Sequence, residues 1–332
     1  MKQGNCNVVD AARLSVAPMM DWTDRHCRYF HRLMSTRTLL YTEMVTAPAL
    51  VRGGALHLLD FDPEEHPVAL QLGGSDPQEL AQAARLGAQA GYDEVNLNCG
   101  CPSDRVQSGT FGAVLMKYPE TVVDCIKAMQ DAVDVDVTVK CRIGVDDQDP
   151  EIVLPDFLER LQRAGCMRVT IHARKAWLQG LSPKENRDVP PLDYNLVRRM
   201  RTEFPNMHLS VNGGIRTLAE TQGFLHDGLD GVMIGRVAYH QPWDILGTAD
   251  ALWGDTPHQS REEVVAKMLP YIAGHIAKGG KLNQVTRHML GLFAGRPGAR
   301  RWRQILSTEA HKPGAGPGVV EEALAAVLAE AA

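Results

Sequence analysis

Long hydrophobic runs are missing from this sequence of 332 residues. Its first residues contain no apolar stretch of the kind found in secretory signals, and no run of about 18 apolar residues follows them. We therefore expect neither a signal peptide nor a membrane-spanning helix, and we expect a cytoplasmic location. Apart from an Ala/Glu-rich tail there is also no low-complexity tract.

Paired cysteines are missing as well. The sequence contains seven cysteines, at positions 6, 27, 99, 101, 125, 141 and 166, and none of them belongs to a CxxC pair. An odd number of scattered cysteines in a chain of this length argues against a disulfide framework and against a zinc site, so no metal is expected. The default interpretation of each is a small buried thiol, and a chemical role has to be argued for each one separately.

What the chain does contain is the composition of a globular protein, with 44% hydrophobic and 23% charged residues. Eight short apolar runs rich in β-branched residues predict strands at Leu14–Ala17, Leu39–Thr42, Val68–Leu72, Glu94–Leu97, Val137–Cys141, Arg168–Ile171, Leu209–Val211 and Gly231–Ile234. Segments of helical periodicity follow most of them, at Pro77–Ala90, Pro119–Ala132, Pro155–Ala164, Leu192–Glu203 and Leu218–His226. Near-continuous hydrophobic strands that alternate with helices indicate a parallel sheet covered on its outside.

An open doubly wound sheet and a closed (β/α)₈ barrel both fit this alternation. Polar or glycine-containing clusters follow nearly every predicted strand, as expected if the loops after the strands converge on one face. This favours an α/β fold of the TIM-barrel type with its active site at the carboxyl ends of the strands. After Trp253 the strand pattern stops, and helices are predicted at Ser260–Lys278, Val285–Leu292 and Val319–Ala331. We therefore predict a barrel domain over residues 1–255 and a small helical domain over residues 256–332.

Charge is distributed unevenly between these two parts. The whole chain has a net charge of −5, but residues 256–332 carry ten Lys and Arg against six Asp and Glu. Such an asymmetry suggests a polyanionic partner for the C-terminal part, although a solvated basic face produces the same count.

Glycines after the last two strands predict a phosphate site. Gly213 and Gly214 follow the seventh strand, and Gly235-Arg236 follows the eighth, where barrels commonly bind phosphate through backbone amides. Lys140 would add a fixed cation at the mouth, which suits a flavin because reduction makes one edge of the flavin ring anionic.

Cys101 lies in a Gly-Cys-Pro turn directly after the fourth strand. Glycine allows a tight bend and proline restricts the exit, so the turn holds a thiol rigidly at the mouth of the barrel. A cysteine thiol is mostly protonated near neutral pH and can donate a proton, but it can equally serve as a nucleophile or have no role.

Eight motifs together closely resemble the tRNA-dihydrouridine synthase family: VAPMMDWTDRHCR, LYTEM, VALQLGGSDP, VNLNCGCPSDRV, VTVKCRIG, IHAR, LSVNGGI and VMIGR. The resemblance runs from about Leu14 to Ser307, and Leu181-Ser-Pro-Lys-Glu-Asn-Arg187 is similar to the A-type subfamily, which reduces uridines at positions 20 and 20a of the tRNA D-loop. It implies FMN as cofactor, NADPH as reductant and tRNA as partner.

The resemblance also implies a role for particular residues. Cys101 matches the family's proton donor, and Asn98 matches a residue beside the target uracil. The implied FMN contacts are Pro18, Met19, Met20, Gln71, Lys140, His172, Asn212, Gly213, Gly214, Gly235 and Arg236. The implied tRNA contacts are Lys184, Arg187, Arg300 and Arg303, and a basic cluster formed by Arg296, Arg300, Arg301 and Arg303, with Trp302 among them, is predicted to dock the phosphate backbone.

In the implied reaction, a hydride passes from NADPH through FMN to uracil C6, while Cys101 supplies a proton to C5 of a base extruded from the RNA. Two other functions remain as alternatives. An FMN barrel that reduces a free small molecule leaves the basic C-terminal part unexplained, and a tRNA-binding protein without catalysis leaves Cys101, Lys140 and His172 without a role. The sequence does not determine the oligomeric state, for which a monomer is our expectation.

Overall fold

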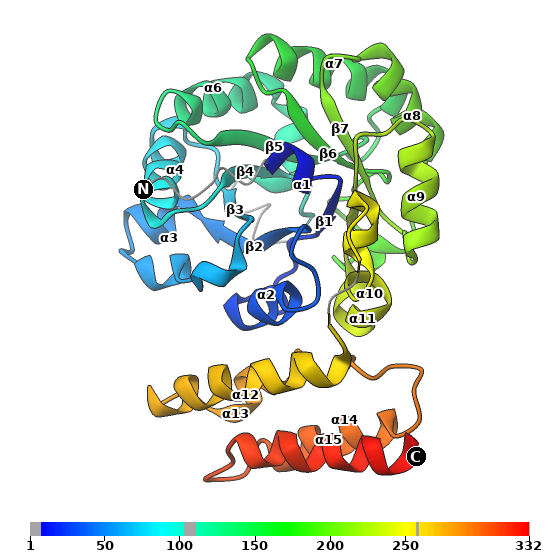
Figure 1. Cartoon of the computed structure of the whole chain (residues 1–332). Helices are drawn as coiled ribbons and strands as arrows, with labels where there is room; N and C mark the ends of the chain where they lie inside the picture. The colour runs from blue at the N-terminus through cyan, green and yellow to red at the C-terminus, as the bar shows by residue number, and fades with distance from the viewer. Residues whose placement is uncertain (1–7, 103–110, 257–258, 332) are drawn as a thin grey trace. The chain divides into compact units, whose positions relative to one another are not determined.

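A computed structural model describes residues 8–102, 111–256 and 259–331 of the chain. Eight parallel strands close into a barrel in which each strand pairs with the next and β8 pairs with β1 (Figure 1). The strands are β1 Leu14–Val16, β2 Leu39–Thr46, β3 Val68–Gly73, β4 Glu94–Cys99, β5 Asp136–Arg142, β6 Arg168–His172, β7 His208–Asn212 and β8 Gly231–Ile234. The predicted (β/α)₈ fold is confirmed, and all eight predicted runs are strands.

Helices connect the strands on the outside of the barrel (Figure 1). They are α3 Ala47–Val51, α4 Pro77–Ala90, α6 Pro119–Gln130, α7 Pro150–Arg163, α8 Tyr194–Glu203 and α9 Leu218–His226, with short 3₁₀ segments at Leu56–Leu59, Pro63–Glu65, Gly112–Lys117 and Glu185–Arg187. Helices α4 and α9 have the predicted bounds. Helix α7 begins at Pro150 rather than at Pro155, because Asp149 caps its amino terminus by accepting a hydrogen bond from the Glu151 amide.

The two faces of the strands differ in polarity. A Cβ placed on Gly87 of α4 would meet Leu70 and Val95, so these apolar residues face the outer helices. The alternate residues therefore point into the barrel. In β4 these are Glu94, Asn96 and Asn98, all buried. The expectation of near-continuous hydrophobic strands thus holds for the outward face, whereas much of the interior is polar.

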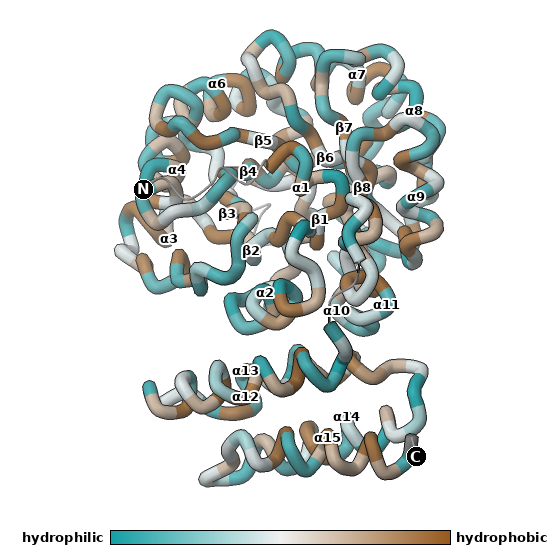
Figure 2. Tube along the Cα trace, viewed as in Figure 1, coloured by the Kyte–Doolittle hydropathy of each residue, from teal (hydrophilic) through white to brown (hydrophobic). Residues whose placement is uncertain are grey.

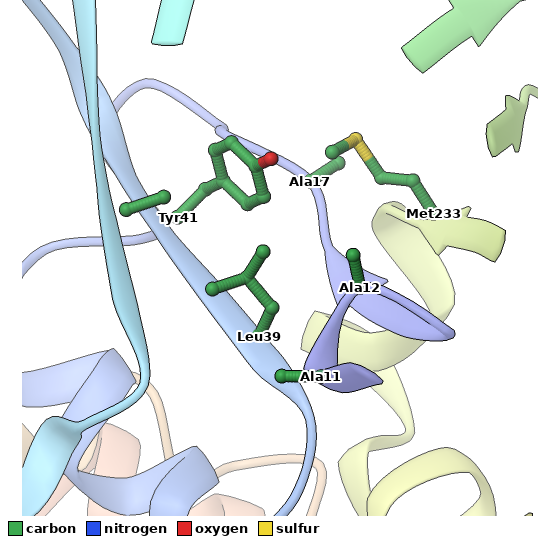
Figure 3. Packing of buried hydrophobic residues seen from close by; sticks show 7 residues of the cluster. Ala11, Ala12, Ala17, Leu39, Tyr41 and Met233 are labelled. Carbon is green, nitrogen blue, oxygen red and sulfur yellow. The ribbon is translucent and has the colours of Figure 1, made fainter. Parts of the chain in front are cut away.

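An apolar cluster joins the segment before β1 to the barrel strands. Helix α1, Val8–Ala11, precedes β1, and Ala11 and Ala12 belong to one buried cluster with Leu39 and Tyr41 from the barrel strands (Figure 3). Hydrophobic and hydrophilic residues are mixed along the outer helices (Figure 2).

Among the helices of the described ranges, none is long and apolar enough to cross a membrane.

The chain forms two compact units, one of residues 1–20 and 39–235 and the other of residues 21–38 and 236–332. The second unit therefore includes α2 Arg25–Arg32 and residues 236–255 in addition to the predicted domain 256–332. Its other helices are α10 Arg236–His240, α11 Pro242–Leu246, a 3₁₀ helix Ala249–Trp253, α12 Arg261–Ala277, α13 Leu282–Thr286, α14 Ala299–Glu309 and α15 Pro317–Ala331.

Two predictions about the helical unit are wrong. The predicted helix Val285–Leu292 stops being helical after Thr286, and Gly291 lies so close to the His240 carbonyl that an added Cβ would be 2.2 Å from its oxygen. Trp302 is fully buried, with its ring against Phe293 and its Nε1 donating to the Met289 carbonyl at 2.9 Å, so it is part of the core and not of a docking surface.

Asp24 connects the start of α2 with the residues that follow α13 within the second unit. It caps α2 by accepting from the His26 and Cys27 amides, and it contacts Arg287 and His288. Burial by itself would raise the pKa of Asp24, but the contacts with His288 and Arg287 outweigh burial and hold this pKa well below its usual range.

Replacing Asp24 with asparagine is expected to destabilise the helical unit by about 1.5–3 kcal/mol near pH 7, because Arg287 and His288 lose hydrogen bonds to a charged acceptor. A carboxyl whose pKa is lowered by folding contributes stability above its ordinary pKa and loses it as the pH falls. The advantage of wild type over the variant should therefore shrink below about pH 4 in urea titrations. A difference that is the same at pH 3 and pH 7 would contradict this assignment.

Candidate active site at the carboxyl ends of the strands

Two glycines after β7 adopt backbone conformations that other residues rarely take. The φ angles are +111° at Gly213 and +73° at Gly214. A Cβ on Gly213 would lie 2.7 Å from the His172 ring, and one on Gly214 would lie 2.7 Å from Leu192. The Tyr194 hydroxyl donates to the Gly213 carbonyl at 2.6 Å. The absence of side chains thus lets the backbone of this loop approach His172 at the end of β6.

Neighbouring strand ends bring further predicted residues together. His172 pairs in register with Asn212, whose side-chain amide donates to the Met233 carbonyl of β8 at 2.8 Å. A Cβ on Gly235 would lie 3.7 Å from the Met19 sulfur, so the loops after β1 and β8 are adjacent. Pro18 and Met19 are half-buried and Met20 is exposed. Arg236 is the first residue of α10 and belongs to the other compact unit.

Two cations lie near the carboxyl end of β5. Lys140 and Arg142 are alternate residues of this strand and therefore share its inward face. Among the residues that the structure describes, neither has a carboxylate partner. Burial, together with the nearby Arg142 charge, lowers the pKa of Lys140 from its usual 10.5 to about 8. Burial also lowers the pKa of Arg142 to about 10. An uncompensated positive charge in a partly buried site favours an anionic ligand.

The Cys101 turn is held from two sides. The Asn98 side-chain oxygen accepts hydrogen bonds from the backbone amides of Gly100 and Cys101, at 3.0 and 2.9 Å. On the other side the Arg142 guanidinium donates to the Gly100 carbonyl at 2.9 Å. Cys101 is half-exposed, whereas the other five cysteines in the described ranges are buried. The turn therefore presents a thiol in a fixed place at the mouth of the barrel.

Asn98 and Gln71, both predicted to contact a ligand, are almost completely buried. Asn98 is 7% exposed and Gln71 is 1% exposed, and the Asn98 amide nitrogen donates to the Gln71 side-chain oxygen at 2.7 Å. The Asn98 oxygen already accepts two hydrogen bonds, so what this side chain can offer to a uracil is its second amide hydrogen.

The loop after β6 carries two of the predicted tRNA contacts on its surface. Its centre is Asn186, which is fully buried and hydrogen-bonds both the amide and the carbonyl of Trp177, at 2.7 and 2.8 Å. Lys184 and Arg187 flank this anchor and are exposed. Arg142 donates to the Asn186 carbonyl at 2.9 Å, so it connects this loop with the Cys101 turn.

The other two predicted tRNA contacts belong to the helical unit. Arg300 and Arg303 are exposed, and both lie on α14, three residues apart and hence on one side of the helix. Neither is in an ion pair with any residue of the described ranges. Arg296 precedes the helix, at whose start Gly298 has a φ of +78°.

Sequence reasoning missed Arg142 and Asn186. A signal for Arg142 was present, because an arginine two residues after Lys140 in a strand must share its inward face. For Asn186 no such signal existed, because the loop pattern does not reveal which of its polar residues is buried.

Comparison with known proteins assigns the chain to a family. Residues 15–330 match the family described as Dihydrouridine synthase (Dus). The tRNA-dihydrouridine(20/20a) synthase of Vibrio parahaemolyticus is 54% identical over 96% of this chain and 98% of its own length. The protein of the same name from Pasteurella multocida is 56% identical over 95% of this chain and 96% of its own length.

Solved structures with low sequence identity share the barrel fold. The crystal structure of TcOYE with pHBA has a TM-score of 0.52 at 13% identity, covering 76% of this chain and 92% of that chain. Morphinone reductase has a TM-score of 0.51 at 14% identity, covering 76% and 88%. With a family match over nearly its whole length and relatives above 50% identity, the chain belongs to the dihydrouridine synthase family.

Proposed function

We propose that this protein is an oxidoreductase that reduces uridine to 5,6-dihydrouridine at positions 20 and 20a of the tRNA D-loop. The relatives named above carry that activity in their names over almost the full length of this chain. In this proposal FMN is the cofactor, NADPH is the reductant and Cys101 donates a proton to uracil C5.

The observation that carries the proposal is the fixed thiol beside uncompensated cations. Asn98 and Arg142 hold the Cys101 turn at the same strand ends that present Lys140. A rigid proton donor next to a site for an anionic ligand fits a reduction in which hydride and proton arrive separately.

The residues at the mouth fit FMN. Gly214 after β7 is exposed and has no side chain that would keep a phosphate from its backbone, and Lys140 and Arg142 supply positive charge. When bound there, FMN would supply the hydride that reaches uracil C6. Gly213, Gly214 and His172 would hold its phosphate, and Lys140 would contact its ring. The residues Pro18, Met19, Gln71, Asn212 and Gly235 complete the proposed lining.

A direct test is to incubate the purified protein with NADPH and tRNA that lacks dihydrouridine, and to map the product by position. Dihydrouridine at positions 20 and 20a is the expected result. Turnover of small enones or free pyrimidines without any change in tRNA would favour the small-molecule reductase, and tRNA binding without a flavin absorbance would favour the non-catalytic binder.

We further propose that Lys184, Arg187, Arg300 and Arg303 bind the tRNA backbone. All four side chains are exposed, which supports contact with a large ligand. Two of them lie on a loop anchored by Asn186, and two lie on one side of α14. Fixed presentation of basic side chains lowers the entropic cost of binding a polyanion.

Single alanine variants at these four positions are expected to bind tRNA more weakly and with a shallower salt dependence. Each lost phosphate contact should lower the slope of log K against log salt by about one. NADPH oxidation should not change, because the flavin chemistry does not involve these side chains. Arg163→Ala is a suitable control, since that guanidinium is paired with Glu159 on the surface of α7. Wild-type affinity and slope in all four variants would place the RNA elsewhere on the protein.

A further inference from the structure

A line of hydrogen bonds runs through the barrel interior, away from the Cys101 turn. The Asn98 amide nitrogen donates to the Gln71 oxygen at 2.7 Å, and the Gln71 nitrogen donates to the Asn96 oxygen at 2.8 Å. The Asn96 nitrogen donates to the Thr138 hydroxyl at 2.8 Å, and that hydroxyl donates to the Glu94 carboxylate. All five side chains are buried, with exposures between 0% and 7%.

At both ends of this line of hydrogen bonds, the donor and acceptor roles are fixed. At the mouth, the backbone amides of Gly100 and Cys101 can only donate, so they require the Asn98 oxygen. At the other end Glu94 is ion-paired with Arg168 at 2.8 Å and accepts from the Tyr41 hydroxyl at 2.7 Å. A carboxylate only accepts. The side chains between the two ends can exchange donor and acceptor roles. Only one direction of donation, from Asn98 toward Glu94, matches the donating amides at the mouth and the accepting carboxylate at the other end.

We propose that Glu94 is a positioning residue for the reaction, whose carboxylate orients the Asn98 amide through Thr138, Asn96 and Gln71 and so holds the Cys101 turn. Glu94 and Asn98 are four residues apart on one strand, hence about 13 Å along it. Glu94 therefore acts on the mouth without touching it. The inference rests on the proposed role of Cys101 as the proton donor.

Reversal of the line shows what Glu94 prevents. If a donor replaced the carboxylate, Thr138 would accept from it and donate to Asn96, and the Asn96 and Gln71 amides would turn over. Gln71 would then donate to the Asn98 oxygen, and the Asn98 amide nitrogen would face the donating amides of Gly100 and Cys101. Two donors facing each other in a buried site are unfavourable, so the turn would have to move.

The test interrupts the line without removing a charge. Thr138→Val deletes the hydroxyl between Asn96 and Glu94, and Tyr41→Phe is a matched control because it deletes the other hydroxyl bound to the same carboxylate oxygen. Amide hydrogen exchange at Gly100 and Cys101 is measured residue by residue by mass spectrometry. We expect exchange to be about three- to tenfold faster in Thr138→Val, from the loss of about one hydrogen bond, and unchanged in Tyr41→Phe.

Turnover provides a second readout. In Thr138→Val the kcat for dihydrouridine formation should fall by a similar factor while the KM for tRNA stays the same, because the thiol is displaced and RNA binding is not affected. Equal exchange rates at Gly100 and Cys101 in wild type and Thr138→Val, or the same acceleration in both variants, would overturn the proposal. Hydrogen exchange does not depend on turnover, so this result stands apart from any failure of the proposed function.

Glu94→Gln removes the fixed acceptor itself and leaves Arg168 without its buried partner. Where this variant folds, exchange at Gly100 and Cys101 is expected to be at least as fast as in Thr138→Val. Exchange slower than in Thr138→Val would contradict the control of the line by Glu94. If the loss of the ion pair prevents folding, Thr138→Val and its control carry the test alone.

Discussion

Replacing Cys101 with alanine is expected to lower the rate of dihydrouridine formation by about 10² to 10⁴, the usual contribution of general acid catalysis. The Asn98 contacts to this turn involve the backbone amides of Gly100 and Cys101, which alanine retains. The geometry of the turn should therefore survive, and the loss should come from the missing proton. Reduction of bound flavin by NADPH should proceed at the wild-type rate, because it requires no thiol.

Cys99→Ala is the matched control for this experiment. Cys99 is the last residue of β4 and follows the inward-facing Asn98, so its side chain points away from the barrel interior. It is fully buried there, and burial raises the pKa of its thiol well above the usual range. Per folded molecule, this variant should form dihydrouridine at close to the wild-type rate. Measurement of flavin reduction and of tRNA modification in both variants separates the two half-reactions. Wild-type turnover in Cys101→Ala would remove this residue from the mechanism.

Local sequence signals predicted the elements that local interactions determine. Helix α4 begins after Asp76, whose side chain accepts from the Glu79 amide, and α9 begins with a capping box between Thr217 and Glu220. Both have the predicted bounds. The predicted range for α7 begins at Pro155, five residues after the observed start, and this proline lies inside the helix. Proline is tolerated there at the cost of one backbone hydrogen bond.

For the candidate site, the sequence predicts which residues lie near strand ends and does not predict which of them pair. The sequence placed Cys101, Lys140 and the Gly213 loop at strand ends, and the structure places them there. Which polar side chains meet inside the barrel depends on the register of neighbouring strands and on closure of the sheet, and a single sequence contains neither. Glu94 at the start of a strand therefore gave no sign of the line of hydrogen bonds that it terminates.

Lys140 is expected to stabilise the flavin-bound protein and to destabilise the flavin-free one. Burial lowers its pKa from 10.5 to about 8, so the folded protein without flavin holds this charge at a cost. Between about pH 8 and 10.5 the unfolded chain binds this proton and the folded chain does not. The free energy of unfolding should therefore rise with pH across that window, and the cost is fully present below about pH 8.

Replacing Lys140 with methionine should consequently have opposite effects in the two forms. In flavin-free protein at pH 7, the variant should be more stable by about 1–3 kcal/mol, since one pKa unit corresponds to about 1.4 kcal/mol, and the rise between pH 8 and 10.5 should disappear. In the presence of FMN the order should reverse, because the variant lacks the cation proposed to contact the flavin ring and so gains less stability from the ligand. Denaturant titrations with and without FMN measure both effects, and the exposed Lys127→Met serves as the control for loss of a lysine on this domain.

A flavin-free Lys140→Met protein that is less stable than wild type at pH 7 would show that the charge of this lysine does not destabilise the folded protein. Equal stabilisation of variant and wild type by FMN would show that the charge does not contact the cofactor.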